Sequence, residues 1–364
     1  MFQPRLLVLV GNGVSIAANP NLALDRLTER FLARHNADAG LNHLLDSLDI
    51  PREEARRDFE RVIGGVEAAE AVIRAFMELS EASPISAVRE AGALLDDAGV
   101  PDAVRHVYYA YCSEVLHAIG ELTRQNIAPS VLRFGEWLNS MHEWHGQTAI
   151  FTLNYDVLLE RMLINADILG LAGRLTDYFS GLPDRQREIE LVPGEPAVVA
   201  KLFTPTDPPD RPVRLHHLHG CLTHFHELDT GNVLKVDSAL VRDLGVYQRF
   251  GDGDTGGFLP AVILGSQKAR KVTDWPFEFA FEALREALRS ADVIAIAGYS
   301  FRDEAVNIYL RNAVARRAGR RWIVIDQRDA DDSQKFERRV VSVLPDTDIE
   351  WCLDGLQGEL PQVR

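Results

Sequence analysis

The first residues that could do chemistry form the Gly-Asn-Gly-Val-Ser motif at residues 11–15, directly after an apolar run at residues 6–10. Glycines in this position let backbone amides approach a phosphate, and the N-terminus of a following helix favours negative charge. The motif departs from Gly-x-Gly-x-x-Gly because Ile16 stands three residues after Gly13. Taken alone, it equally fits a tight turn in which Ser15 caps a helix.

Two further motifs offer an amide, a carboxyl group and an imidazole. Asn154 and Asp156 follow the apolar run at residues 148–153, and His219 follows a histidine-rich run at residues 213–218. A histidine at the end of a strand is well placed as a general base, because imidazole titrates near neutrality. Asn154 and Asp156 have a simpler interpretation as a cap and a first-turn acid of the next helix.

The same histidine-rich segment also allows a metal site. His217, His219 and Cys221 alternate along the chain, so an extended strand could present three zinc ligands on one face. We regard this as the weaker interpretation, because a glycine is expected to end the strand before the cysteine. His224 and His226 are expected in an exposed loop.

The last two motifs follow the apolar runs nearest the C-terminus. Gly298 and Ser300 could face a nucleotide, but Ser300 and Asp303 also match a capping box, which needs no ligand. Asp326 ends the next run, where a carboxylate suits the two hydroxyls of a ribose. Its simpler interpretation is a turn aspartate.

The elements that must position these residues alternate between strands and helices, which predicts an α/β fold with a Rossmann-like, mostly parallel sheet and helices on both faces. We expect strands at residues 6–10, 148–153, 261–264, 293–297 and 322–325, with a less certain one at 213–218, and helices at 157–163, 276–289 and 303–317. Ligands of open α/β sheets collect at the carboxyl ends of the strands. All five motifs are therefore expected around one nucleotide-binding crevice.

Two long segments interrupt this pattern. Residues 23–146 have few β-rich runs and many Ala, Leu, Glu and Arg residues, which predicts a large helical insertion between the first two strands. Residues 170–211 are rich in Pro, Gly and charge, and are expected to be irregular.

Composition limits the possible functions. The chain has 364 residues and a formal net charge of −15, which works against broad electrostatic capture of nucleic acid or anionic membranes. Cys112, Cys221 and Cys352 include no Cys-x-x-Cys pair, so a four-cysteine zinc module cannot be built and we expect no zinc. The opening apolar run is too short for a signal peptide or a membrane helix, so we expect a cytoplasmic protein.

Taken in order, the five motifs resemble those of the sirtuin superfamily, and more closely the sirtuin-like (Sir2-type) NAD-consuming domains of bacterial anti-phage defence systems. They are Gly-Asn-Gly-x-Ser at 11–15, Leu-Asn-Tyr-Asp at 153–156, Leu-His-Gly at 218–220, Gly-Tyr-Ser-Phe-x-Asp-Glu at 298–304 and Val-Ile-Asp at 324–326. The resemblance covers the first 20 residues and roughly residues 147–352. It implies an NAD-binding domain made of residues 1–22 and 147–356, with residues 23–146 inserted.

The resemblance also implies a role for each matching residue. The cofactor-binding positions are Gly11, Asn12, Gly13 and Ser15 in the glycine loop, and Gly298, Ser300 and Asp326 around the adenosine half of NAD. The catalytic positions are Asn154 and Asp156, beside the nicotinamide ribose and carboxamide, and His219 as the catalytic histidine. Asn12 replaces a residue that is small in the protein deacylases, and Asp326 stands where they usually carry Asn.

The missing zinc module decides between branches of the family. In the deacylases, paired cysteines beyond the catalytic histidine hold a zinc domain that helps to form the acyl-lysine channel, whereas here only Cys221 follows at short range. The resemblance therefore favours the zinc-free NAD glycohydrolases, with NAD as the substrate and ADP-ribose and nicotinamide as products. A cyclised product in place of ADP-ribose stays open.

Two other functions stay open at this stage. A catalytically silent sensor of NAD or ADP-ribose would have the same crevice. A nucleic-acid-acting subunit would need a basic surface, and the only dense basic cluster is Arg316, Arg317, Arg320 and Arg321, which equally fits cations at a helix end.

The resemblance also bears on partners. Defence-type relatives imply a homo-oligomer, or assembly with a HerA-like translocase ATPase or an Argonaute-like subunit, with nucleic acid contacted only indirectly. The long amphipathic helical insertion could supply the surface for such an assembly.

Overall fold

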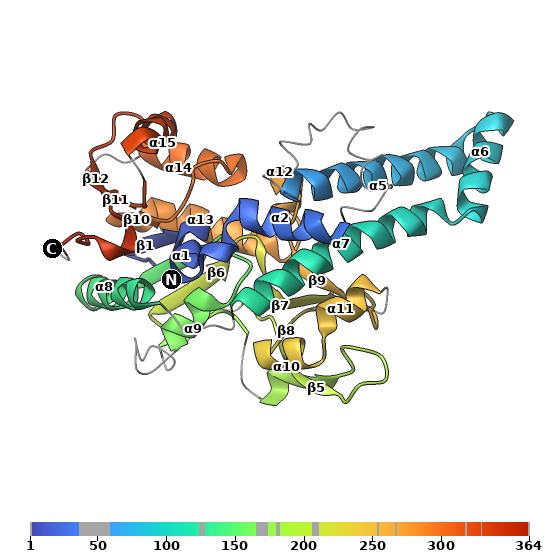
Figure 1. The fold of residues 1–364 in the computed structure, drawn as a ribbon, viewed down its shortest axis with the longest axis horizontal. Helices are drawn as coiled ribbons and strands as arrows, with labels where there is room; N and C mark the ends of the chain where they lie inside the picture. Colours follow the sequence, from blue (N-terminus) through green and yellow to red (C-terminus); the bar gives the residue numbers. More distant parts are fainter. Residues whose placement is uncertain are drawn as a thin grey trace.

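Two β-sheets and a projecting helical insertion make up the chain (Figure 1). The structure is a computed structural model that describes residues 2–35, 59–123, 128–164, 174–179, 183–205, 211–252, 255–265, 268–316, 319–328 and 330–362. Within these ranges, no helix is both long and apolar enough to cross a bilayer.

The first sheet has seven strands, and every pairing in it is parallel. Across the sheet the strands are β12 (Ile349–Cys352), β11 (Arg321–Ile325), β10 (Val293–Ala297), β1 (Leu6–Val10), β2 (Thr148–Thr152), β6 (Val213–His217) and β3 (Leu175–Thr176). The central strands are continuous apolar runs because helices cover both faces, as in other parallel sheets. This confirms the α/β, Rossmann-like fold predicted from the sequence.

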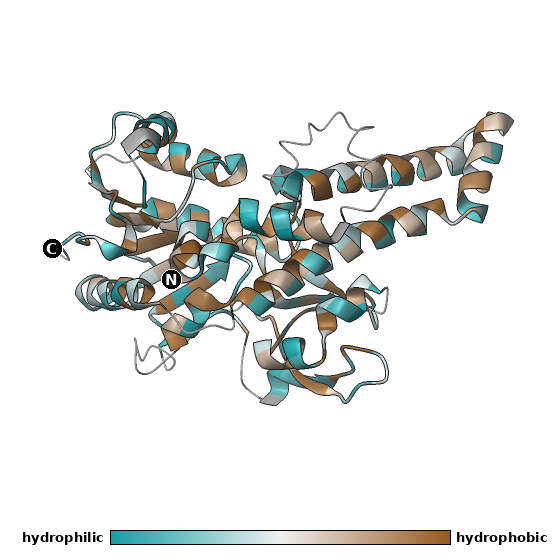
Figure 2. Ribbon diagram, in the orientation of Figure 1, coloured by the Kyte–Doolittle hydropathy of each residue, from teal (hydrophilic) through white to brown (hydrophobic). Residues whose placement is uncertain are grey.

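Alternate residues of β1 enter two different cores. Leu7 and Leu9 pack with the helices α13 (Phe277–Ser290), α14 (Glu304–Arg316) and α15 (Ala330–Val343). Leu6, Val8 and Val10 point to the opposite face, which is covered by α1 (Asn12–Ala18), α8 (Pro129–His145) and α9 (Leu158–Ile164). Figure 2 shows hydrophobic and hydrophilic residues alternating along the helices, as expected for helices that pack on a sheet with one face and meet water with the other.

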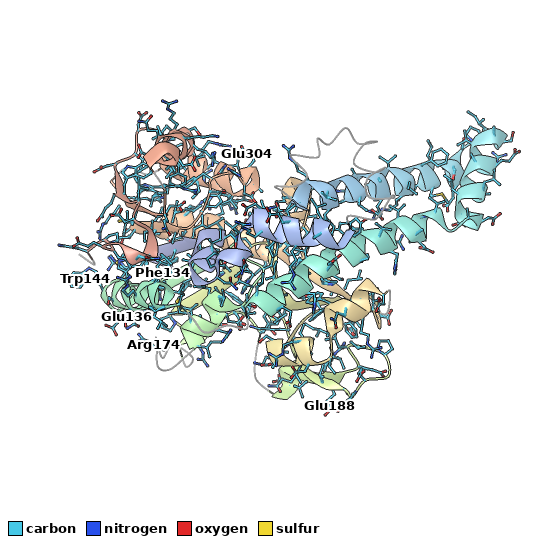
Figure 3. All side chains as sticks on the ribbon, in the orientation of Figure 1. Phe134, Glu136, Trp144, Arg174, Glu188 and Glu304 are labelled. Carbon is cyan, nitrogen blue, oxygen red and sulfur yellow. The ribbon has the colours of Figure 1, made fainter. Side chains whose placement is uncertain are left out.

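The helix α8 shows how the second layer is formed. Phe134 is fully buried in the core beneath the sheet, and Glu136, two residues later, is exposed. Figure 3 labels both side chains on the helix, together with Trp144 near its end. Because two residues correspond to about 200° of rotation in an α-helix, one face packs on the sheet and the other meets water.

A second, antiparallel sheet was not predicted from the sequence. Its strands, in order, are β4 (Gln186–Ile189), β5 (Val198–Leu202), β8 (Val233–Val236), β7 (Gly220–Glu227) and β9 (Phe258–Val262). Two expectations are therefore wrong: residues 261–264 do not add a strand to the parallel sheet, and the described part of residues 170–211 is not simply irregular. A short apolar run shows that a strand is buried, but it does not show which sheet contains that strand.

The helical insertion packs on this second sheet. Its helices are α2 (Leu24–His35), α5 (Phe59–Ala82), α6 (Ser86–Asp97) and α7 (Val100–Leu122), followed by α8. Side chains of α2, α5 and α7 share one hydrophobic core with β7, β8 and the helices α10 (Ser238–Asp243) and α11 (Val246–Gly251). The far ends of α5 and α7 and the connecting α6 project away from the rest of the molecule (Figure 1).

Contact between the ends of β1 and β10 depends on glycine. A Cβ on Gly11 or Gly13 would lie 2.6 Å from backbone atoms of Gly298, so a side chain fits at neither position. Gly298 has φ +62°, and a Cβ there would lie 2.6 Å from the amide of Val14. The two strand-end turns therefore meet backbone against backbone.

We predict that Gly298→Ala lowers the free energy of unfolding more than Gly319→Ala. Gly319 has φ +78° and open space around it, so its substitution introduces only the left-handed strain. Gly298→Ala adds a backbone clash, which should cost about 1–3 kcal/mol more. Chemical denaturation of both variants measures the difference, and equal losses would show that the close contact contributes nothing.

Candidate active site

One large cavity lies at the carboxyl edge of the parallel sheet. It has a volume of about 1310 Å³, which exceeds the roughly 300–1,000 Å³ of common small-molecule sites. The predicted site residues that line it are Gly11, Asn12, Gly13, Asn154, Asp156, His219, Gly298, Ser300 and Asp326. The remaining one, Ser15, is buried behind the wall and touches two of the others.

The glycine loop is held by its own polar groups. The amide of Gly13 donates to the carbonyl of Gly298 at 2.8 Å, so it is not free to meet a phosphate. The side-chain amide of Asn12 donates to the carbonyl of Leu22 at 2.9 Å, which ties the loop to the start of the helical insertion. The close packing of backbones thus explains both Gly11 and Gly13 without a ligand.

Asn154, Ser15 and Asp156 form a buried hydrogen-bonded array. Asn154 Nδ2 donates to Ser15 Oγ at 2.8 Å and to the carbonyl of Gly11 at 3.2 Å, and Ser15 Oγ donates to Asp156 Oδ2 at 2.6 Å. Because its amide nitrogen is engaged twice, the orientation of Asn154 is fixed. Its Oδ1 is buried and accepts no hydrogen bond from the described residues.

Asp156 has a double role in this array. Its Oδ1 accepts from the amide of Leu158 at 2.8 Å, so Asp156 caps α9, whereas the simpler interpretation predicted Asn154 as the cap and Asp156 in the first turn. Burial raises the pKa of Asp156 above its ordinary value, and the hydrogen bonds from Ser15 and from the Leu158 amide act against this shift. Both carboxylate oxygens already have partners, so Asp156 reinforces the position of Ser15.

His219 lies beside a carboxylate that the sequence interpretation had assigned only to capping. The Nε2 atom of His219 is 3.2 Å from Asp303 Oδ2, and both side chains are almost fully buried. Lys268 Nζ, on α12 (Lys268–Lys271), lies 3.6 Å from the same oxygen. Lys268 also pairs with Glu60 Oε2 at 2.9 Å, so α5 of the helical insertion reaches this part of the crevice.

The two motifs nearest the C-terminus also line the cavity, but their hydrogen bonds differ from those that the sequence predicted. Asp303, rather than Ser300, caps α14, because Asp303 Oδ1 accepts from the amide of Val306 at 3.3 Å. Asp326 accepts from Arg328 Nη2 at 2.8 Å and from the amide of Gln327 at 2.7 Å. Burial raises the pKa of Asp326 in spite of the nearby guanidinium.

Sequence reasoning missed Asp303, Lys268 and Glu60 as members of the site. Asp303 was visible in its motif, but a complete capping explanation concealed its second contact. Lys268 and Glu60 carry no local signal, because they meet only through the tertiary fold.

The histidine-rich segment does not form the zinc site considered above. His217 ends β6, whereas Cys221 lies in β7, and no cluster of three or more His, Cys, Asp or Glu side chains suited to a metal occurs in the described part of the chain. His224 and His226 lie in β7 and not in an exposed loop; burial lowers the pKa of both, and of His217 to about 4.

Two of the four arginines of the basic cluster are engaged within the protein, and Arg316 is exposed. Arg320 is buried and donates to the carbonyl of Arg289, and Arg321 pairs with Glu350 at 2.7 Å. Arg317 lies outside the described residues. These contacts give the nucleic-acid interpretation no support.

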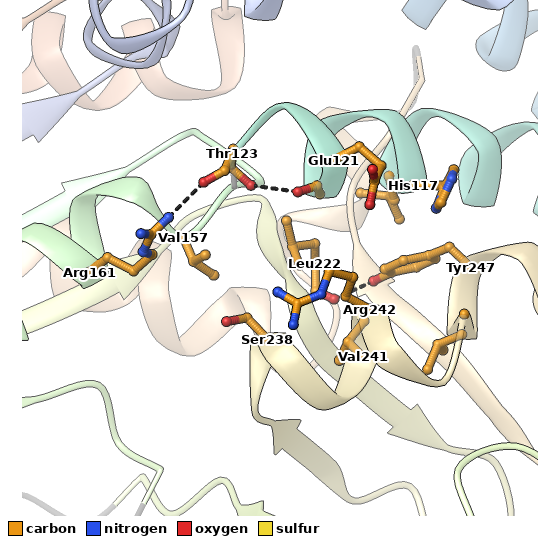
Figure 4. Close-up of a pocket in the computed structure, with 14 residues that line it drawn as sticks. His117, Glu121, Thr123, Val157, Arg161, Leu222, Ser238, Val241, Arg242 and Tyr247 are labelled. Carbon is orange, nitrogen blue, oxygen red and sulfur yellow. Dashed lines mark hydrogen bonds between the residues drawn. The ribbon is translucent and has the colours of Figure 1, made fainter. Parts of the chain in front are cut away.

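A second cavity of about 290 Å³ lies behind the crevice, between α7, α9, β7, α10 and α11 (Figure 4). Val157 and Leu222 line it, and they follow closely on Asp156 and His219 in the chain. Arg161 closes one side by donating to the carbonyl of Thr123 at 2.6 Å. The segments that carry the catalytic candidates therefore contribute residues to the lining of both cavities.

A parallel sheet whose strand ends gather a glycine turn, an Asn–Asp pair and a histidine around one crevice defines a Rossmann-type fold. The model of the SIR2-like domain matches residues 148–344, and the chain belongs to this family. A solved structure entitled "Structural Basis for the Mechanism and Regulation of Sir2 Enzymes" is 14% identical, with 94% of this chain and 92% of that chain covered and a TM-score of 0.34. No curated protein matches the sequence.

We predict that Ser15→Ala destabilises the protein, because it leaves Asp156 Oδ2 buried without its donor. An unsatisfied buried acceptor costs about 1–3 kcal/mol. The matched control is Ser140→Ala, an exposed helical serine, which should change the free energy of unfolding by no more than about 0.5 kcal/mol. Urea denaturation at neutral pH compares the two, and a stable Ser15→Ala variant would contradict the role of the array.

Proposed function

We propose that this chain is an NAD glycohydrolase that cleaves NAD to ADP-ribose and nicotinamide. Its membership of the SIR2-like family supports NAD-dependent activity in general. The observation that carries the proposal is the fixed orientation of Asn154, whose buried Oδ1 accepts no hydrogen bond from the described residues. Such an acceptor suits a ribose hydroxyl or a water molecule in a crevice with His219.

In the proposed reaction, the bond between ribose C1′ and the nicotinamide nitrogen breaks, and its electron pair leaves with nicotinamide. Positive charge develops on the ribose, as in other glycosidic cleavages. Asn154 Oδ1 holds the ribose or the attacking water, and His219 accepts the proton that the water or ribose hydroxyl loses. Asp156 keeps Ser15 and Asn154 in place and contacts the carboxamide.

The positions of the three cysteines support the zinc-free branch of the family. Cys112 lies in α7, Cys221 in β7 and Cys352 in β12, so the cysteines belong to separate elements. We therefore place no metal in the reaction and treat NAD as a substrate. A role as an effector in anti-phage defence rests on the resemblance of the five motifs to defence-type domains.

We predict that the purified chain, in the assembly that activates it, releases nicotinamide from NAD, and that Asn154→Ala and His219→Ala each lower the rate by about 10²–10⁴-fold. Asn139→Ala and His106→Ala are matched controls, since both residues lie outside the crevice, with His106 exposed and Asn139 partly exposed. Chromatographic measurement of nicotinamide checks this. Near wild-type rates in both crevice variants would disprove the catalytic assignment, and tight NAD binding without turnover would identify a sensor instead.

We also infer that activity depends on assembly with a second copy or a partner, such as a HerA-like ATPase or an Argonaute-like subunit. An unregulated NAD hydrolase would deplete a cofactor that every cell needs. The projecting part of the helical insertion exposes apolar side chains: Val72 is 67% exposed, Leu79 61% and Leu94 70%. Val72 and Leu79 are seven residues apart, so they share one face of α5.

For this assembly we predict that Val72→Glu combined with Leu79→Glu reduces both the mass in solution and the specific activity. Val341→Glu, at an exposed position of α15, should change neither. Light scattering and NAD turnover across protein concentrations provide the measurements. A monomer with constant specific activity, with or without the candidate partners, would exclude the idea.

A further inference from the structure

We propose that Asp303 is a positioning residue that holds the imidazole of His219 through Nε2 and leaves Nδ1 to act on the substrate. This inference rests on the proposed NAD cleavage, in which His219 accepts a proton. Its basis is the pair of atoms 3.2 Å apart, His219 Nε2 and Asp303 Oδ2, on side chains that are only 3% and 9% exposed. The two groups come from different elements, the β6–β7 connection and the start of α14.

Helix capping uses only one of the two carboxylate oxygens of Asp303. The cap uses Oδ1, which accepts from the amide of Val306, while Oδ2 faces His219 and Lys268. A carboxylate needed only as a cap could be replaced by Ser, Thr or Asn, which cap helices comparably well. The contact with His219 therefore gives a separate reason for a carboxylate at this position.

The backbone that carries Asp303 is strained and firmly held. Phe301, two residues earlier, has φ +54°, a left-handed conformation that a bulky residue rarely adopts. Asn307 Nδ2 donates to the carbonyl of Phe301 at 3.1 Å, and the Tyr299 hydroxyl donates to the carbonyl of Asp303 at 2.9 Å. Strain of this kind persists where surrounding contacts fix it, and it is common at functional sites.

The charges around His219 favour an ionised Asp303. Burial raises its pKa, but the contact with His219 and the charge of Lys268 outweigh burial and hold the pKa below its ordinary range. Lys268 is neutralised in turn by Glu60. The ring of Tyr155 also stacks near His219, with its hydroxyl 3.1 Å from Glu60 Oε1.

An ionised carboxylate beside Nε2 selects the tautomer with the proton on that nitrogen, and it stabilises the imidazolium that forms when Nδ1 takes up a proton. The two atoms are not aligned as a hydrogen bond in this structure. Catalytic pairs often tighten only when substrate binds. Asp303 also lines the crevice, but in this proposal it influences the rate of the chemical step through His219.

The test separates positioning from capping with four variants. Asp303→Asn and Asp303→Ser keep the helix cap but remove the carboxylate, Asp303→Glu restores a carboxylate, and Asp303→Ala removes both functions. We expect the Asn and Ser variants to lose about 10²-fold or more in kcat, with KM for NAD within about threefold and a wild-type melting temperature. The Glu variant should recover part of the loss.

Two results would overturn the inference. Full activity in the Asn and Ser variants, with a loss only in the Ala variant, would show that Asp303 is a cap. An Asp303→Asn substitution that still lowers kcat when added to His219→Ala would show that it acts independently of His219.

A measurement without turnover keeps this inference distinct from the proposed function. Nitrogen-15 NMR of the imidazole rings, with His219→Ala to assign the signal, should show the proton of His219 on Nε2 in the wild type and a changed tautomer in Asp303→Asn. Unchanged ring shifts would refute the pairing. A wild-type chain that shows the pairing but releases no nicotinamide would instead refute NAD cleavage alone.

Discussion

The backbone contact between the ends of β1 and β10 is the constraint on which the rest of the site depends. Gly11 and Gly13 approach Gly298 so closely that no side chain fits between them. This contact fixes the start of α1 and therefore the position of Ser15. Ser15 in turn joins Asn154 to Asp156, so a packing requirement at one pair of strands orients the amide at the next.

The sequence predicted the parallel sheet and the place of its polar motifs because both follow from local patterns. Buried strands appear as continuous apolar runs, and the residues after them must lie at one edge. The antiparallel sheet was missed because its strands lie in segments that polar residues, Pro and Gly interrupt. In Val198–Leu202, for example, buried Val198 and Ala200 alternate with exposed Val199 and Lys201. Burial of His224 and the pairing of Asp303 with His219 depend on which segments meet in space, which no local pattern records.

The helical insertion is also part of the site. Glu60 pairs with Lys268, and Lys268 lies beside the carboxylate that faces His219, so a charge from α5 influences the same cluster. The opposite part of the insertion projects from the molecule with exposed apolar side chains. A partner bound there would act on a helix that touches the crevice, which gives the proposed control by assembly a physical route.

The central claim is that this crevice cleaves NAD with water, and isotope labelling tests it most directly. The chain would be incubated with NAD in water enriched in oxygen-18, and the products analysed by mass spectrometry. Hydrolysis should give equal amounts of nicotinamide and ADP-ribose, with one heavy oxygen at C1′ of each ADP-ribose formed. Intact NAD, or a cyclised product without the label, would contradict it.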